Sequence, residues 1–527
     1  MLEIVTTLAH IFRAEGKELF MVGGTVRDLL LHRGGSPDID LTTNARPEEI
    51  RRLVNRTDPV AVIVMGEQFG TIRVHYARQA DASQSETVGA SSPRPASLDP
   101  EPVSDVDIVE ITTYRSDVYA SDSRKPEVTF GDRLEDDLLR RDFTINAMAL
   151  DPLGGDIIDP WGGQVDLAAR LVRAVGNDPE RRFDEDPLRM LRAARFAAQL
   201  GFTIEPSTAH AMGAQSVTLG KISRERIRDE LTKLLVTSRP SLGLRLLVDF
   251  DLMPYIVPEV LELRGVSQAP AHSKDVYEHV LRVVERNPSR PASRWAGLLH
   301  DIAKPRTKSV ENGKVHFYGH EDVGAVMTRD ILRRLKFDKP FIDHVSRLVK
   351  LHMRANSYLP EWTDGAVRRM MLDAGDAMDD LLDLSSADIT SYRPEKVSRA
   401  EKRVEELRAR CQWLREEAER VPLRSPLDGN DLMALFGREP GAWIRPIKDY
   451  LLNLVIDEQL SPDDREEAER EARHAMDLLE HGLPLPAPQM PPAAPPPGEE
   501  PHVGERKRER RAAQRRQSRA ATGPGKG

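Results

Sequence analysis

Residues 21–43 read MVGGTVRDLLLHRGGSPDIDLTT, and this stretch decides how the first part of the chain folds. The pair Gly23-Gly24 follows an apolar run, and a backbone without Cβ atoms can approach a ligand closely. Backbone N–H groups at a helix start, with Arg27 in the first turn, favour a bound phosphate. A plain turn between strand and helix is the alternative, because the stretch contains neither a Walker A loop nor G-x-G-x-x-G.

The second half of the same stretch predicts a metal site. Asp38 and Asp40 are two residues apart, so on a strand both carboxylates point to one face and can bind Mg²⁺ through oxygen. A solvated turn is the alternative for this pair alone. Glu110 interrupts the apolar strand IVEITTY, where a carboxylate is costly to bury without a cation. Three carboxylates on adjacent strands can hold two Mg²⁺ ions, and Asp107 is the alternative third ligand.

The composition limits the possible classes of protein. A chain of 527 residues exceeds one core, and three or four domains are expected. No apolar run is long enough for a bilayer, and no signal peptide is recognised. The single Cys411 excludes internal disulfides and cysteine-based zinc sites and favours the reducing cytoplasm. With a net charge of −9, an RNA or DNA partner requires a local basic face.

The pattern along the chain predicts an α+β head followed by an all-helical body. Residues 1–20 indicate a helix, and ELFMVGG, TIRVHYA and VDIVEITTYR indicate strands of a mixed sheet. A Ser/Pro/Asp-rich loop insertion is expected at about 79–104. From about Leu138 the pattern is mainly helical. The Pro-rich and then basic segment 482–527 is expected to be disordered, and its basic run could add non-specific RNA affinity.

Five motifs follow one another in a recognisable order: GGTVRD…DID, RRDFTINAMAL, DPLGG…DPWGG, DEDPLRMLRAARFAAQLGF and ISRERIRDEL. In order and spacing they resemble the class II tRNA nucleotidyltransferases. These belong to the polymerase-β-type superfamily and include CCA-adding enzymes and bacterial poly(A) polymerases. The resemblance is dense to about residue 265 and continues through an HD-type domain to about residue 400.

The resemblance implies a division of the chain into five parts. These are a nucleotidyltransferase head (1–170), a helical neck for base recognition (171–265), an HD domain (266–400), a helical C-terminal region (401–481) and the tail (482–527). The C-terminal region is expected to contact the tRNA elbow.

The resemblance also implies roles for single residues. Asp38 and Asp40 correspond to catalytic metal ligands. The residues implied to bind the triphosphate are Gly23, Gly24, Arg27 and Arg141. Further implied nucleotide contacts are Asp142 at the ribose 2′-hydroxyl, Asn146 in support, and Arg192 and Arg195.

Asp186 and Arg189 correspond to the pair that reads the incoming base, and physical chemistry supports that role. We expect them at positions i and i+3 of one helix, as neighbours. Aspartate only accepts hydrogen bonds and arginine only donates them. Cytosine and adenine present a donor amine beside an acceptor nitrogen, whereas guanine and uracil present the reverse, so one pair can select C and A. An ordinary surface ion pair is the alternative.

A second set of residues predicts a metal-dependent phosphohydrolase. His300 and Asp301 are adjacent in WAGLLHDIAKP, with His279 upstream and Asp388 downstream, which resembles the HD pattern. Imidazole and carboxylate together suit a divalent metal, whose identity the sequence leaves open. The additional ligands expected at a second metal are His320 and His352. Satisfied core or surface histidines are the alternative.

Three hypotheses about function follow. The first is template-independent addition of CCA to tRNA from CTP and ATP, with release of pyrophosphate by two-metal transfer. The second is a poly(A) polymerase or an A-adding enzyme of the same family, although VMGEQFGTIRV favours the CCA-adding form. The third is an HD phosphohydrolase whose head only binds RNA. The expected partners are tRNA, CTP and ATP without a membrane, and the oligomeric state stays open.

Overall fold

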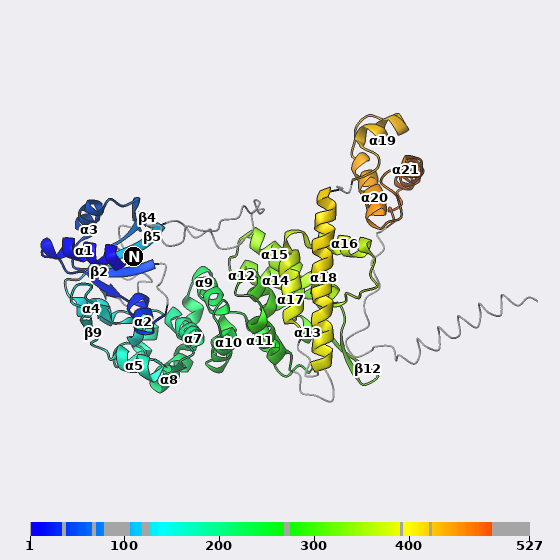
Figure 1. Cartoon of the computed structure of the whole chain (residues 1–527). Helices are drawn as coiled ribbons and strands as arrows, with labels where there is room; N and C mark the ends of the chain where they lie inside the picture. Colours follow the sequence, from blue (N-terminus) through cyan, green and yellow to red (C-terminus); the bar gives the residue numbers. More distant parts are fainter. Residues whose placement is uncertain are drawn as a thin grey trace, which may run out of the picture. The chain divides into compact units, whose positions relative to one another are not determined.

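The protein is represented by a computed structural model that describes residues 2–33, 38–65, 70–77, 106–118, 127–267, 275–389, 394–420 and 424–486. The chain divides into two compact units, Met1–Lys350 and Leu351–Gly527. The helices and strands of both units are labelled in Figure 1. Each unit is described by itself below.

The first unit begins with the mixed α/β head that the sequence predicted. Its helices are α1 (Leu2–Ala14), α2 (Gly24–Leu30), α3 (Pro47–Val54), α4 (Leu134–Leu139) and α5 (Gly163–Ala169). Its main sheet contains β1 (Phe20–Val22), β2 (Asp38–Thr43), β3 (Ala61–Val64), β4 (Thr71–Ala77), β5 (Val106–Thr113), β8 (Ala149–Leu150) and β9 (Ile157–Ile158). The predicted insertion falls mainly on residues outside the described ranges.

The sheet brings together strands that are distant in sequence. The strand order is β3-β4-β5-β2-β1-β8-β9, and β2 runs parallel to β5 while the other neighbours are antiparallel. Ile72 and Val74 of β4 are fully buried, and they alternate with Arg73 on the opposite face. Because side chains alternate along each strand, one face of the sheet forms core and the other carries charged groups.

Smaller strand pairs complete the first unit. The strands β6 (Arg115–Val118) and β7 (Glu127–Phe130) are antiparallel. Residues 119–126 between them lie outside the described residues. The strands β10 (Leu171–Val172) and β11 (Thr203–Ile204) are parallel. The pair β10 and β11 was not anticipated, because it lies in the region from about Leu138 that was predicted to be mainly helical.

The helical body after the head is confirmed. It contains α6 (Pro179–Glu185), α7 (Leu188–Leu200), α8 (Pro206–Gln215), α9 (Arg224–Leu235) and α10 (Pro240–Asp249). The helix α7 packs against both α9 and α10, which lie beside it in Figure 1. Leu191, Ala194 and Ala198 are buried at helical spacing, and Gly201 ends α7 with a φ of 71°.

The rest of the first unit is the predicted HD region. Its elements are α11 (Val276–Arg286), α12 (Pro291–Leu299), α13 (Lys304–Thr307), β12 (Lys308–Glu311), β13 (Lys314–Phe317), α14 (His320–Arg334) and the first part of α15 (Lys339–Asn356). Asp275 caps α11 by accepting from the N–H of Tyr277 at 2.7 Å. The helices α11 and α12 pack together, and this packing positions His279 near His300.

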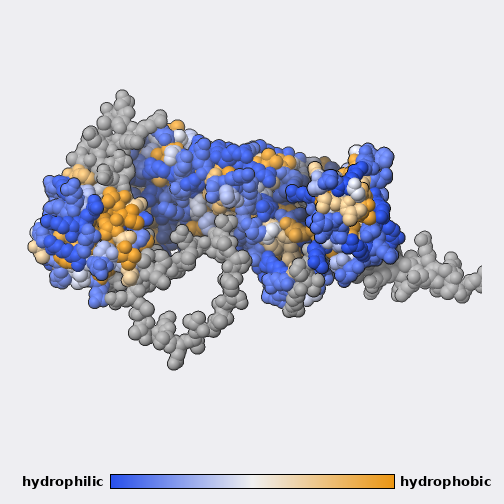
Figure 2. Space-filling model, turned by 90° about the horizontal axis from the view of Figure 1, so that it is seen from above, coloured by the Kyte–Doolittle hydropathy of each residue, from blue (hydrophilic) through white to orange (hydrophobic). Residues whose placement is uncertain are grey.

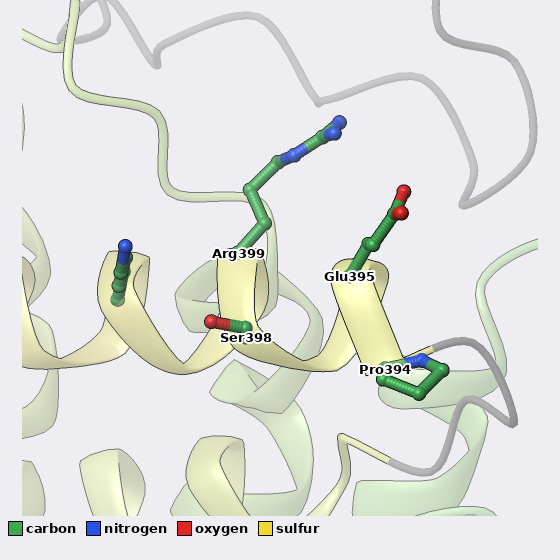
Figure 3. A pocket seen from close by; sticks show the side chains of 5 residues that line it. Pro394, Glu395, Ser398 and Arg399 are labelled. Carbon is green, nitrogen blue, oxygen red and sulfur yellow. The ribbon is translucent and has the colours of Figure 1, made fainter.

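All described secondary-structure elements of the second unit are helices. It continues with α16 (Asp364–Ala374), α17 (Met378–Ala387), α18 (Pro394–Arg420), α19 (Gly429–Phe436), α20 (Ile444–Ile456) and α21 (Arg465–Glu480). An open pocket at the start of α18 is shown in Figure 3, where Glu395 and Arg399 extend from the same side of the helix. Its lining consists of Pro394, Glu395, Ser398, Arg399 and Lys402.

Polar residues dominate the visible surface, and one apolar patch lies over the head (Figure 2). The large exposed apolar side chains of the head near edge strand β3 are Val60, Ile63, Val64 and Met65. Among the described helices, none has the length and apolar character needed to cross a bilayer. Residues 487–527 of the predicted tail lie outside the described ranges.

Candidate functional site

The predicted carboxylates meet on the charged face of the sheet. Asp40 of β2 is the direct neighbour of Glu110 of β5, and Glu110 is in turn paired with Arg73 of β4. The Glu110 carboxylate accepts from Nε of Arg73 at 2.8 Å and from Nη2 at 2.5 Å. Asp107 precedes Glu110 by three residues, so its side chain points to the opposite face. Asp38 belongs to β2, but its side chain lies outside the described residues.

Gly23 lies where the cationic and anionic groups converge. It caps α2 with φ 69° and ψ −137°, a conformation that glycine adopts readily. A Cβ atom here would lie 2.9 Å from Nη1 of Arg141 and 3.6 Å from Oδ2 of Asp40. The half of the opening stretch that is predicted to bind phosphate and the half that is predicted to bind metal therefore border one space, which Arg141 also enters.

A chain of hydrogen bonds links the head to α7. Arg27 is buried and donates from Nη1 to Oδ1 of Asn146 at 2.8 Å. Asn146 donates from Nδ2 to Oδ1 of Asp142 at 3.1 Å. The other oxygen of Asp142 accepts from Nε and Nη2 of Arg192 at 2.8 and 2.6 Å. Four residues predicted separately as nucleotide contacts are thus one connected network.

Asp142 is held in its ionised form. Burial alone raises the pKa of its carboxyl, but the charge of Arg192 and hydrogen bonds from Asn146 and Phe143 outweigh burial and lower the pKa to about 2. An ionised carboxylate only accepts hydrogen bonds. At neutral pH, Asp142 therefore suits a hydroxyl donor such as a ribose 2′-OH.

Asp137 orients the arginine pair and was missed in the sequence. It is fully buried and accepts from Arg140 at 2.9 Å and from Nη2 of Arg141 at 3.2 Å. Burial raises the pKa of Asp137, but the two arginines outweigh burial and lower it. Its position three and four residues before the arginines, in a short helix, was the signal that could have identified it.

The predicted helical spacing of Asp186 and Arg189 is wrong. Helix α6 ends at Glu185, Asp186 is extended with φ −148°, and α7 starts only at Leu188. Pro187 causes the break, because the residue before a proline is driven out of the helical region. Asp186 still lies at the start of α7, where it accepts from the Leu188 N–H at 3.2 Å.

The side chains of the predicted base-reading pair have different partners, and the two residues are joined through the backbone, where the Arg189 N–H donates to the Asp186 carbonyl oxygen at 3.0 Å. Oδ2 of Asp186 accepts from Arg226 of α9 at 2.7 Å. Arg189 is buried and donates to Oε2 of Glu185 at 3.0 Å and to the carbonyl oxygen of Arg140 at 2.7 Å. The alternative of a surface ion pair between the two is therefore wrong.

Arg195 connects α7 to α9. It is ion-paired with the buried Glu230 and donates from Nη1 to Oε1 of Gln199 at 2.9 Å. The helix α9, which carries most of the motif ISRERIRDEL, packs against α7 and so supports the helix that bears Arg189.

The HD residues of the first unit form a compact buried cluster. Nε2 of His279 lies 3.1 Å from Nε2 of His300, and both nitrogens lie within 3.3 Å of Oδ2 of Asp301. Nε2 of His320 lies 3.4 Å from the other oxygen of Asp301. Ligand atoms from His279, His300 and Asp301 are close enough to share one ion. Two imidazoles and a carboxylate fit a divalent metal.

Backbone carbonyls fix the tautomers of two of these histidines. Nδ1 of His300 lies 2.9 Å from the oxygen of Gly297, and Nδ1 of His320 lies 2.7 Å from the oxygen of Phe317. A carbonyl oxygen only accepts, so each Nδ1 carries the proton and each Nε2 presents a lone pair. These are the tautomers that metal ligation requires.

Asp301 is the ionised centre of this cluster. Burial raises the pKa of its carboxyl, but His300 and Lys304 outweigh burial and hold the pKa well below its usual range. Lys304 donates to Oδ2 of Asp301 at 2.6 Å. A metal arriving at this oxygen would share it with the ammonium group.

The two remaining predicted HD ligands, Asp388 and His352, belong to the second unit. Asp388 ends α17, and its Oδ2 accepts from Asn356 at 2.6 Å. His352 is buried on α15.

Family models match most of the first unit. The poly(A) polymerase head domain matches residues 19–95 and 96–173, the probable RNA and SrmB-binding site of polymerase A matches residues 201–263, and the HD domain matches residues 271–393. The nucleotidyltransferase head and the HD domain both imply the use of divalent metal.

Relatives decide the family. An A-adding tRNA nucleotidyltransferase of Deinococcus radiodurans is 37% identical over 62% of this chain and 76% of its own length. A CCA-adding enzyme of a Geobacillus species is 30% identical over 86% of this chain and 92% of its own length. This chain belongs to the tRNA nucleotidyltransferase/poly(A) polymerase family. A further member, a CC-adding tRNA nucleotidyltransferase of Thermus thermophilus, is 35% identical over 59% of this chain and 70% of its own length.

A solved structure agrees with this family assignment and confirms the predicted fold class. The CCA-adding enzyme of Bacillus stearothermophilus, in complex with CTP, aligns with 91% of this chain and 98% of its own chain. The TM-score is 0.61 and the sequence identity 25%. Like the other members named above, this chain is a tRNA nucleotidyltransferase with a mixed α/β head followed by a helical part and an HD domain.

Proposed function

We propose that this nucleotidyltransferase adds CCA to the 3′ end of tRNA from CTP and ATP without a nucleic-acid template. The observation that carries the proposal is the convergence of Asp40 and Arg141 at Gly23. A nucleotide triphosphate bound with its cation needs both kinds of group in one place.

The transfer itself is a displacement at the α-phosphorus. The 3′ oxygen of the tRNA bonds to that phosphorus, the bond to the bridging oxygen breaks, pyrophosphate leaves, and the hydroxyl proton passes to solvent. Arg27 and Arg141 hold the triphosphate, and Asp142 accepts the ribose hydroxyl. Mg²⁺ at Asp38 and Asp40 would lower the pKa of the hydroxyl and offset the charge of pyrophosphate.

Glu110 contributes to this site together with Arg73. The guanidinium group of Arg73 offsets part of the negative charge that Glu110 and Asp40 bring to neighbouring strands. Arg73 donates to Oε1 of Glu110, so we assign Oε2 as the oxygen that would bind the metal.

Base choice rests on Asp186 and Arg189. In the structure both hold protein partners, Arg226 for the carboxylate and Glu185 for the guanidinium. Cytosine or adenine can replace those partners with a matching donor and acceptor, whereas guanine and uracil leave buried groups unpaired.

The relatives include A-adding, CC-adding and CCA-adding enzymes. Membership of the family therefore leaves open which nucleotides are added and how many, and we propose all three, C, C and A. Residues 66–69 of the stretch that favours the CCA-adding form lie outside the described ranges. In sequence, the stretch Ser116–Pro126 resembles the element that accompanies A addition in this family, which supports a complete C-to-A sequence. Residues 119–126 of this stretch lie outside the described ranges.

A gel assay separates these alternatives. A tRNA transcript without its CCA end is incubated with CTP alone, ATP alone, or both. We expect two added residues with CTP and a third only when ATP is also present. No incorporation of CTP would defeat CCA addition, and a long ladder with ATP alone would favour the poly(A) polymerase.

We also propose a second activity, metal-dependent phosphohydrolysis at the HD cluster. The supporting observation is the buried group His279, His300 and Asp301, whose ligand atoms are close enough to share one ion and in which Nε2 of His300 presents a lone pair. In the variant His300→Ala/Asp301→Ala, we expect bound metal and phosphohydrolysis to be lost, while exposed His210→Ala retains both. An unchanged metal content in the double variant would reject this site.

The variant Asp40→Ala tests the hypothesis that the head only binds RNA. It should abolish transfer and leave tRNA binding and phosphohydrolysis intact. The ranges of the three family models support the proposed parts 1–170, 171–265 and 266–400, whereas the parts 401–481 and 482–527 stay predictions. With tRNA, CTP and ATP as substrates, we propose a cytoplasmic location.

A further inference from the structure

The ring of Phe196 on α7 lies among three guanidinium groups. Cζ of Arg195 lies 4.0 Å from the ring centroid, that of Arg27 lies 5.2 Å away, and that of Arg192 lies 5.4 Å away. The ring is 5% exposed, and Phe143 meets it at 82° with the centroids 5.8 Å apart. A cation within about 6 Å of a ring centroid is attracted by the ring quadrupole. Phe196 is thus a common contact of three cations as well as a core residue.

The three cations would otherwise repel one another in a buried setting. Burial lowers the pKa of Arg195, and the charge of Arg192 adds to this, while Glu230 opposes it. For Arg192, burial is outweighed by Asp142, so its pKa is raised. The negative face of an aromatic ring is an apolar surface that still tolerates adjacent cations. An aliphatic side chain of similar size offers packing without that attraction.

The ring also contacts the residues at both ends of the hydrogen-bonded network. Arg27 begins the chain through Asn146 and Asp142, and Arg192 ends it. Both end residues contact the ring of Phe196. Arg27 belongs to α2 of the head, whereas Arg192 shares α7 with Arg189. The ring therefore joins the triphosphate contacts to the helix that carries the base-reading arginine.

We propose that Phe196 is a positioning residue that holds Arg27 and Arg192 in one arrangement around the incoming nucleotide. The inference rests on the proposed transfer function, because it assigns these arginines to the nucleotide. A change of the ring should therefore alter the KM for CTP and ATP and leave the KM for tRNA unchanged.

The test replaces the ring while keeping an apolar side chain. In Phe196→Leu, we expect kcat/KM for CTP and ATP to fall about tenfold, mainly through KM, with the KM for tRNA unchanged. The matched control is Phe202→Leu, because Phe202 is also 5% exposed and follows α7 directly. This control should lower Tm to a similar extent without changing the KM for either nucleotide.

A fluorinated phenylalanine at position 196 separates the ring face from packing. Fluorination withdraws electrons from the face and largely keeps the shape, so this variant remains informative where Phe196→Leu fails to fold. We expect the KM for CTP to rise with each added fluorine. A KM that does not change across the series would overturn the proposal.

Failure of the inference and failure of the proposed function are distinguishable. If the unmodified protein extends no tRNA, the proposed transfer function is wrong. Equilibrium dialysis with CTP and Mg²⁺ then still tests Phe196, and an affinity equal to that of Phe202→Leu would overturn the positioning role. If the unmodified protein extends tRNA and Phe196→Leu matches the control, only the positioning role is wrong.

Discussion

The transferase site and the HD cluster differ in how their functional groups are held. In the transferase site, Gly23, Asp40 and Arg141 come from separate segments that the sheet brings together. In the HD cluster, His300 and His320 are each oriented by a carbonyl three residues earlier in the chain. Sheet pairing assembles the first site. In the HD cluster, helix packing brings the side chains together, and local turns set the orientation of two imidazoles.

The two sites also differ in whether their ligand-binding groups are already paired with other protein groups. The arginines of the transferase site already have protein partners, so an anionic substrate enters a network that must exchange contacts. In the HD cluster, backbone carbonyls set the tautomers of His300 and His320 beside the Asp301 carboxylate, so a cation meets imidazoles that are already oriented. We expect substitutions to separate the two sites cleanly.

The largest effect is expected from Asp40→Asn, which should abolish nucleotide transfer and leave the HD cluster unchanged. Loss of a metal-binding carboxylate should lower the rate of nucleotide transfer by about a thousandfold or more. Bound metal at the HD cluster should not change. Primer extension and metal analysis on the same preparation measure both.

The matched control is Asp107→Asn, whose side chain points to the opposite face of β5. It should retain transfer, whereas Glu110→Gln should lose most of it. The reverse order would show that the third carboxylate is misassigned.

A smaller effect is expected from Gly23→Ala, which tests convergence at one space. The added Cβ would lie 2.9 Å from Nη1 of Arg141. The alanine backbone would also have to keep the φ of 69° that Gly23 has. Displacement of Arg141 should lower transfer by about a hundredfold. The control Gly16→Ala has the same φ with nothing within 4 Å of the added atom, so it reports backbone strain alone. Equal activity of the two variants would contradict convergence at Gly23.

The smallest predicted effect concerns stability and its dependence on pH. The pKa of Asp142 is lowered to about 2, so its ionised form stabilises the folded state. That contribution, about 2 kcal/mol, is complete above about pH 4 and is lost as pH falls toward 2. Asp142→Asn should therefore lower Tm at pH 7, and the difference from the unmodified protein should shrink below pH 4. A difference that is constant from pH 7 to pH 3 would contradict the lowered pKa.

Local periodicity was enough to predict the carboxylate face. The alternation in IVEITTY and the spacing of Asp38 and Asp40 each depend on one strand only, and β2 and β5 have the expected form. The pairing of Glu110 with Arg73 could not be predicted, because it depends on a neighbour in the sheet 37 residues away.

The errors and omissions lie where local rules compete or distant residues meet. Asp186 was assigned to the helix of Arg189 although Pro187 between them disfavours helix at the preceding residue. Phe196 reads as an ordinary core position at helical spacing, and only the tertiary structure places three arginines around its ring. Asp137 was missed because its role depends on burial.

The most direct test of the central claim is the mass of a tRNA transcript lacking its CCA end after incubation with CTP, ATP and Mg²⁺. We predict a gain of two cytidylates and one adenylate, which is lost in Asp40→Asn and retained in His300→Ala. A gain of adenylates alone, or an equal gain in Asp40→Asn, would contradict a single CCA-adding site at Gly23.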